Sequence, residues 1–129
     1  MVIDTSALVA IFLGEPERKL LLEHILHAET KLISAANSFE TGIVIEARRG
    51  ESAGREFDLF LTRANVEVVP VDAEQVEIAR SAWRKYGKGR HAAGLNFGDC
   101  FAYALAKTSE QKLLAKGDDF RFTDVELFV

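Results

Sequence analysis

The sequence has few of the residues that mark secreted, membrane-bound or zinc-binding proteins. It contains a single cysteine, Cys100, so no internal disulfide can form and a reducing, cytoplasmic environment is expected. The apolar helical pattern around Cys100 predicts a buried structural thiol, and no histidine or cysteine has zinc-site spacing. The longest unbroken apolar run, residues 7–13, is too short to span a membrane. No basic segment precedes this run, so neither a secretory signal nor membrane association is expected.

The chain has no strong excess of charge, and no long flexible stretch divides it into parts. The formal net charge of −4 argues against indiscriminate binding to nucleic acid, although it permits a local basic patch. A hydrophobic content of 48% is ordinary for a globular protein. A chain of 129 residues is long enough to bury roughly two-thirds of its surface. We therefore expect residues 1–129 to form a single domain.

Short apolar stretches alternate with longer helical patterns. The expected strands are residues 2–3, 31–33, 66–69 and 113–115, with a further edge strand over 125–129 left open. The expected helices are residues 6–13, 16–28, a segment capped by Ser34 or Asn37 and broken at Gly50, 51–64, 72–86 and 98–108. This alternation predicts an α/β fold in which helices cover both faces of a central, mainly parallel sheet of four to five short strands.

Two of these helices carry apolar stripes that we expect to face the core. The stripes are Phe39, Ile43, Val44 and Ala47 in the helix that ends before Gly50, and Val76, Ala79, Trp83 and Tyr86 in the helix capped by Asp72. The first two helices carry more apolar side chains than one buried face requires. The region from Ala7 to Leu26 is therefore a candidate docking surface for an amphipathic partner helix.

The first ten residues organise the rest of the chain. Val2 and Ile3 form a very short apolar stretch, typical of a strand buried on both faces in a parallel sheet. Asp4 follows directly, at the carboxyl end of that strand, where ligands bind in open α/β sheets. Because an isolated carboxylate is costly to bury, Asp4 is expected to be paired or to hold a metal ion.

Further acids are expected at the same edge of the sheet. Glu40 and Asp99 lie early in helices, and Asp118 and Asp119 directly follow the last predicted strand. Parallel pairing brings these segments together with Asp4. Each acid alone has an ordinary explanation as a helix cap, a solvated side chain or a turn residue. Convergence from four separate segments favours a functional site.

A carboxylate cluster predicts a divalent cation. The acids repel one another, and a cation removes that penalty. Ligands that are all oxygen favour Mg²⁺ or Mn²⁺ over zinc. Thr5 and Ser6 offer a hydroxyl or a backbone N–H beside Asp4 for substrate. A metal ion held by Asp4 and Asp99 would lower the pKa of a bound water, with Glu40 or Asp119 orienting that water.

A basic segment precedes Asp99. No carboxylate occurs between Ile78 and Gly98. Lys88 and Arg90, on a glycine-rich loop, are expected to contact phosphates, whereas Trp83 and Tyr86 are expected to lie in the core.

These motifs together resemble a known family. The stretches are Val2-Ile3-Asp4-Thr5-Ser6-Ala7, Glu40, Gly94-Leu95-Asn96-Phe97-Gly98-Asp99-Cys100, and Lys116-Gly117-Asp118-Asp119-Phe120 with Thr123-Asp124. They resemble the PIN-domain ribonucleases and, more narrowly, the VapC toxins of bacterial toxin–antitoxin pairs. The likeness covers the whole chain, and the motifs occur in the family's order.

The resemblance implies a three-layer α/β/α fold and an endoribonuclease that depends on Mg²⁺, with Mn²⁺ as the alternative. It implies a structured RNA substrate such as tRNA or rRNA, a VapB-like antitoxin and a homodimer. By motif position, Asp4, Glu40 and Asp99 correspond to metal ligands. Asp119 is the preferred fourth acid, and Asp118 is retained as a neighbouring candidate.

Other readings of the acids are weaker. A receiver domain would require a phosphoacceptor aspartate after the third strand, where Asp72 serves only as a helix cap. An aspartyl phosphatase would require a second aspartate two residues after Asp4, where Ser6 stands. A catalytically inactive PIN-like module that binds RNA or a partner protein remains the alternative.

Overall fold

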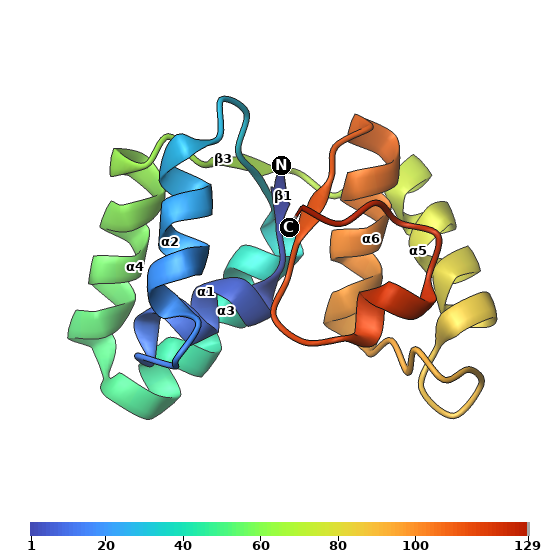
Figure 1. The fold of residues 1–129 in the computed structure, drawn as a ribbon, viewed down its shortest axis with the longest axis horizontal. Coiled ribbons are helices and arrows are strands. Elements are labelled where there is room, and N and C mark those ends of the chain that lie inside the picture. Colours follow the sequence, from blue (N-terminus) through green and yellow to red (C-terminus); the bar gives the residue numbers. More distant parts are fainter. Residues whose placement is uncertain (129) are drawn as a thin grey trace.

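The computed structural model describes residues 1–128 and arranges them around one central sheet (Figure 1). The strands are β1 (Val2–Ile3), β2 (Leu32–Ser34), β3 (Glu67–Val69) and β4 (Leu113–Leu114). They pair in parallel in the order β3-β2-β1-β4, with Val2 opposite both Leu32 and Leu113. The predicted α/β fold with a parallel sheet is therefore confirmed.

Helices cover both faces of the sheet. They are α1 (Thr5–Phe12), α2 (Arg18–His27), α3 (Ala35–Arg49), α4 (Glu51–Arg63), α5 (Ala73–Tyr86) and α6 (Phe97–Ser109). In Figure 1, α1, α2 and α4 lie on one side of the strands, and α5 and α6 lie on the other. Helix α3 contacts both α4 and α6, so it links the two sides. The predicted three-layer arrangement is confirmed.

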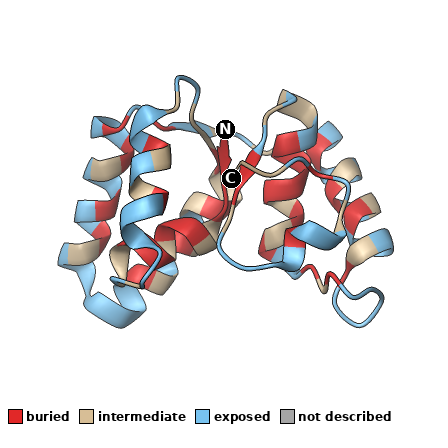
Figure 2. Cartoon of the chain, in the orientation of Figure 1, coloured by how far each residue is buried: buried red, intermediate tan, exposed pale blue. Residues whose placement is uncertain are grey.

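The side chains on the two faces of the sheet belong to two separate hydrophobic cores, because successive side chains in a strand point to opposite faces. Ile3, Ile33 and Leu114 join the core beneath α1, α2 and α4. Val2 and Leu113 join the core beneath α5 and α6. Buried residues accordingly flank the sheet on both sides in Figure 2. Since β1 lies between β2 and β4, Asp4 follows a central strand whose two side chains are fully buried.

The expected apolar stripe of α3 is wrong. Phe39 and Ile43 are 71% and 51% exposed, and Ala47 is also exposed. The residues that this helix buries are instead Asn37, Thr41 and Ile45. The buried polar side chains are hydrogen-bonded: the Asn37 amide donates to the carbonyl of Gly98 in α6, and the Thr41 hydroxyl donates to the carbonyl of Asn37 within α3. Ser34, not Asn37, caps the helix by accepting from the backbone N–H of Ala36.

The expected stripe of α5 is partly wrong. Val76 and Trp83 are 49% and 46% exposed. The buried side of this helix is formed by Gln75, Ala79 and Ala82, while Tyr86 is half-buried. The buried face is therefore rotated by about one position, and small alanines allow α5 to pack closely on α6. Trp83 is left at the surface beside α6.

The segment after β4 folds back over α6 and returns to the sheet. It contains the 3₁₀ turn η1 (Asp119–Phe122). It then runs beside β4, where the backbone N–H of Leu113 donates to Glu126 and that of Phe128 donates to Leu113. Leu127 forms an isolated parallel bridge with Leu113 in place of the possible edge strand over 125–129, and Val129 lies outside the described residues. Within residues 1–128, no helix has the length and apolar character needed to cross a bilayer.

Candidate active site

Asp4 is a buried carboxylate with one oxygen unused. Only 2% of the residue is exposed. Its Oδ2 accepts from the backbone N–H of Ser6 at 3.0 Å and so caps α1. Its Oδ1 is buried and has no hydrogen-bond partner within the described part of the chain. Burial raises the pKa of Asp4, and the nearby charge of Glu40 raises it further. A buried oxygen without a partner is costly, so this oxygen is a candidate ligand atom.

Glu40 reaches the same edge from α3. Its Oε1 accepts from the Thr5 hydroxyl at 2.5 Å and from the Asn37 amide at 3.4 Å. The carboxylate also lies directly against the Cα of Gly98, so closely that a Cβ at position 98 would overlap it. Glu40 is thus held between the start of α1 and the start of α6.

Asn37 is a site residue that the sequence analysis considered only as a helix cap. It is fully buried, and its amide donates to the carbonyl of Gly98 at 3.0 Å and to the Thr5 hydroxyl at 3.2 Å. It therefore ties α3 to both α1 and α6. The available signal was its place on α3 three positions before Glu40, because side chains three apart share one helix face.

Asp99 lies in the first turn of α6 and takes part in a reciprocal cap. Its backbone N–H donates to the side chain of Asn96, and its Oδ2 accepts from the backbone N–H of Asn96 at 3.0 Å. Burial raises the pKa of Asp99 to about 7, and the charges of Asp4, Asp119 and Glu40 add to that rise. Asp4, Glu40 and Asp119 therefore all lie within electrostatic reach of Asp99.

The two aspartates after β4 differ in their surroundings. Asp118 is exposed and pairs with Arg121 at 3.2 Å. Asp119 opens η1, and its charge contributes to the raised pKa of Asp99. Asp119 is thus the member of this pair that acts on Asp99, although both side chains are exposed.

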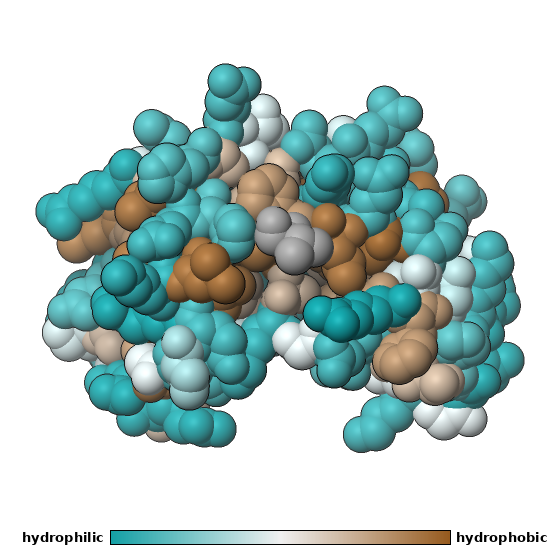
Figure 3. All heavy atoms as spheres, viewed as in Figure 1, coloured by the Kyte–Doolittle hydropathy of each residue, from teal (hydrophilic) through white to brown (hydrophobic). Residues whose placement is uncertain are grey.

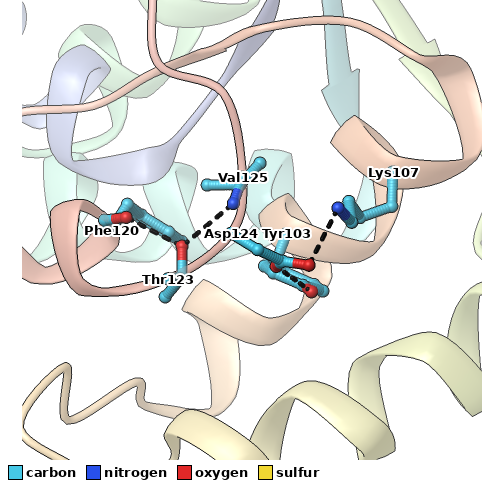
Figure 4. Close-up of polar contacts among 6 residues, drawn as sticks. All are labelled: Tyr103, Lys107, Phe120, Thr123, Asp124 and Val125. Carbon is cyan, nitrogen blue, oxygen red and sulfur yellow. Dashed lines mark hydrogen bonds and ion pairs between the residues drawn. The ribbon is translucent and has the colours of Figure 1, made fainter.

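The C-terminal segment that carries Asp119 is anchored to α6 (Figure 4). The buried phenol of Tyr103 donates to Asp124 Oδ1 at 2.5 Å, and the Lys107 ammonium lies 3.1 Å from Asp124 Oδ2. The hydroxyl of Thr123 closes the turn by donating to the carbonyl of Phe120 at 2.7 Å. These bonds fix the position at which η1 faces α6.

The oxygen donors of these acids fit a divalent cation, although they are not arranged as a complete set of ligands around one ion. Within residues 1–128, no three Asp, Glu, His or Cys side chains stand close enough together to ligate one ion. Glu40 and Asp99 each direct one carboxylate oxygen into an internal hydrogen bond. Their other oxygens and the unpaired Oδ1 of Asp4 are hard donors, the kind that Mg²⁺ and Mn²⁺ accept. The outline of the molecule is notched at this edge, between the half with α1 and the half with α6 (Figure 3).

The expected substrate contacts fall into two groups. Thr5 donates to Glu40, and the Ser6 hydroxyl accepts from the backbone N–H of Lys116 at 2.9 Å, so both support the site internally. Lys88 is exposed and has no ion pair with any described residue. Arg90 lies over the ring of Trp83, with its guanidinium carbon 4.6 Å from the ring centroid.

Comparison with known proteins identifies the fold and the relatives. A family model described as the PIN domain matches residues 1–126. The chain belongs to the PIN domain family. It is 59% identical over 125 residues to a protein named Ribonuclease VapC from Mycolicibacterium smegmatis, a match that covers 97% of each chain.

Solved PIN structures share the fold at much lower sequence identity. One is VapC20 of Mycobacterium tuberculosis, described as a Sarcin-Ricin loop cleaving toxin, with a TM-score of 0.78 and 20% identity over 96% of this chain and 95% of that one. Another is VapBC2 from Rickettsia felis bound to a DNA fragment from its promoter, with a TM-score of 0.74 and 17% identity over 98% and 96% of the two chains. At these identities the likeness shows the fold and nothing more.

Proposed function

We propose that this PIN domain, residues 1–129, is an endoribonuclease toxin of the VapC type that requires Mg²⁺ or Mn²⁺. The observation that carries the chemistry is the buried Asp4 carboxylate, whose Oδ1 has no partner among the described residues and whose charge acts on Asp99 together with those of Glu40 and Asp119. The identity to a ribonuclease over nearly the whole chain supports RNA as the substrate.

The acids have separate tasks in this proposal. Asp4, Glu40 and Asp99 hold the cation, with Asp119 as the fourth acid and Asp118 beside it. A bound divalent cation would lower the pKa of the attacking water and offset charge that builds on the scissile phosphate. Asn37 and Thr5 position the Glu40 carboxylate through their hydrogen bonds. The raised pKa of Asp99 reflects burial and crowding, both of which favour a cation at this place.

The histidines give no support for an alternative acid–base mechanism. His27 Nδ1 bonds to the carbonyl of Glu23, and His24 of α2 packs its ring against Phe128 of the C-terminal segment. His91 accepts from the backbone N–H of Ala93 through Nδ1. Hydrolysis by water, yielding a 5′-phosphate and a 3′-hydroxyl, is therefore the reaction that these residues favour.

The substrate in this proposal is structured RNA, such as tRNA or rRNA. The solved structure of the same fold that is described as cleaving the Sarcin-Ricin loop supports such a target. Lys88 supports it as well, because an exposed lysine that has no carboxylate partner in residues 1–128 is suited to a phosphate.

The partners in this proposal are a second copy of the chain and a VapB-like antitoxin. A solved neighbour of the same fold is a VapBC assembly. A groove of about 460 Å³ runs between the α1–α2 pair and α4, with Phe12, Leu22 and Phe60 in its wall and Arg18 and Arg63 among its polar residues. An amphipathic antitoxin helix with acidic flanks suits this groove. Leu22→Asp should abolish antitoxin binding, whereas Leu26→Asp, on an exposed side chain outside the groove, should not.

The experiment that tests the proposed function is cleavage of purified tRNA and rRNA by the purified protein. Discrete fragments should form with Mg²⁺ or Mn²⁺ and should disappear with EDTA or with Asp4→Asn. Intact RNA under all metal conditions, with binding retained, would instead support the inactive RNA-binding module.

A further inference from the structure

A second, largely apolar cavity lies on the other side of the first turn of α6. Its volume is about 500 Å³, within the roughly 300–1,000 Å³ of sites that hold small molecules or their parts. It is formed between α5 and the start of α6, with the loop between them. Its lining includes Trp83, Lys88, Asn96, Phe97, Cys100 and Phe101. Because Asn96 caps α6 through Asp99, the cavity and the acidic site share one helical turn.

The aromatic walls of this cavity are exposed and are held by contacts with neighbouring residues. Phe97 is 81% exposed and packs edge-on against Phe101, with ring centroids 4.9 Å apart. Trp83 is 46% exposed. Its indole is held by the guanidinium of Arg90 at 4.6 Å and by close approach to Gly87, where a Cβ would overlap the ring. A large aromatic side chain kept at the surface in a fixed position is typical of a stacking platform.

The charges around the cavity suit a nucleic acid. Arg80 and Lys88 line it, and Arg90 lies beside it on Trp83. None of these three cations forms an ion pair with another residue of the described chain. No carboxylate occurs between Ile78 and Gly98. An apolar cavity flanked by cations that form no ion pair within the described chain matches one chemical group in RNA, a base whose neighbouring phosphates contact the rim.

We propose that this cavity binds an unpaired base of the RNA substrate, stacked against Trp83 and Phe97, next to the phosphate that is cleaved. The inference rests on the proposed function, since it places the substrate strand across the first turn of α6. It assigns to Trp83 and Phe97 the selection of unpaired nucleotides. Such a base is available in the loops of a structured RNA and not within its stems, so this contact would direct cleavage to loops.

The single tryptophan of the chain allows a direct test. Trp83 is the only tryptophan, so its fluorescence reports on the cavity alone. The probe is an oligoadenylate of ten nucleotides, compared with an abasic strand of equal length and charge, and Asp4→Asn is used so that neither is cut. The oligoadenylate should quench Trp83 at saturation and bind more tightly than the abasic strand. Phe97→Ala should weaken binding of the oligoadenylate on the order of 10-fold and leave binding of the abasic strand unchanged.

Two further variants separate stacking from charge. Lys88→Ala should weaken binding of the oligoadenylate and of the abasic strand equally, because it removes a phosphate contact only. Leu26→Ala, also at an exposed position but on α2, should change neither.

Equal affinity for the two strands, or fluorescence that does not change on binding, would overturn the inference. So would a conversion of dimer to monomer in Phe97→Ala without any change in base preference, because the cavity would then be an interface between copies. In both cases cleavage of tRNA or rRNA by the unaltered protein would still stand. Failure of the proposed function itself would appear separately, as absence of any metal-dependent cleavage.

Discussion

The Cα of Gly98 at the start of α6 lies against the Glu40 carboxylate of α3, and no side chain fits between them. The contact joins the two helices at the carboxyl edge of the sheet, where Asn37 also bridges them. Gly98 is buried and has an ordinary helical conformation, so its role is the close approach and not an unusual backbone angle.

Gly98→Ala should therefore reduce RNA cleavage strongly while the protein stays folded. The added methyl would meet the end of a flexible side chain, and Glu40 would swing away from Thr5 and Asn37 at little cost. Gly42→Ala is the matched control, because it lies in α3 with nothing near the new methyl. It should keep full activity and gain roughly 0.5–1 kcal/mol of stability. Cleavage rates and urea unfolding check both variants, and full activity in Gly98→Ala would show that Glu40 has no part in the reaction.

Removing one acid should alter the response to metal. Asp99→Asn takes away a charge that burial and three neighbouring carboxylates disfavour. In EDTA this variant should unfold at the same or a higher temperature than the unaltered protein. MnCl₂ should raise the melting temperature of the unaltered protein and not that of Asp99→Asn. Asp58→Asn, an exposed position on α4, should respond to MnCl₂ as the unaltered protein does, and a loss of response there would point to nonspecific metal binding.

The Tyr103–Asp124 bond should make stability depend on acid pH. The Tyr103 phenol, followed by Lys107, holds the pKa of Asp124 below its usual range. Asp124 therefore takes up a proton more readily in the unfolded chain than in the folded one. Its contribution to the free energy of unfolding is fully present above about pH 4 and is lost as the pH falls through the lower pKa of the folded state. Tyr103→Phe should cost about 1 kcal/mol at pH 7 and less near pH 2.5. Urea unfolding at both pH values tests this, and an equal cost at both would exclude the bond as the cause.

The basic loop should control the salt dependence of RNA binding. Lys88→Ala should reduce the slope of log affinity against log salt by about 0.7, the value for one lost phosphate contact with single-stranded nucleic acid. Lys19→Ala, an exposed lysine on α2, is the control and should leave the slope unchanged. Arg90 is a less clean probe, because its removal would also uncover Trp83. An unchanged slope in Lys88→Ala would assign this loop to the solvated surface.

The sequence was sufficient to predict the sheet, and the acids at its carboxyl edge remain the proposed site. Val2 and Ile3 form a short apolar stretch followed by an acid, a pattern that has few interpretations in an α/β chain other than a buried strand. The inward faces of α3 and α5 were predicted wrongly because hydrophobicity was taken as the guide to burial. Asn37 and Thr41 are buried because they bond to neighbouring backbone, and Trp83 remains at the surface because alanines form the contact with α6.

The fine structure of the site lies beyond such patterns. Nothing in the residue spacing indicates that Gly98 makes room for Glu40, since only the packing angle of α3 on α6 brings them together. The difference between Asp118 and Asp119 likewise depends on the turn that η1 makes, in which Asp118 pairs with Arg121.

The chemistry of the cut RNA ends tests the central claim most directly. Purified protein is incubated with tRNA and rRNA in Mg²⁺, with Asp4→Asn in parallel, and the new ends are mapped by ligation that distinguishes a 5′-phosphate from a 5′-hydroxyl. Hydrolysis at the carboxylate site predicts a 5′-phosphate and a 3′-hydroxyl at every cut, and no cuts with Asp4→Asn. Cuts that carry a 5′-hydroxyl and a 2′,3′-cyclic phosphate, or that persist in Asp4→Asn, would contradict the account.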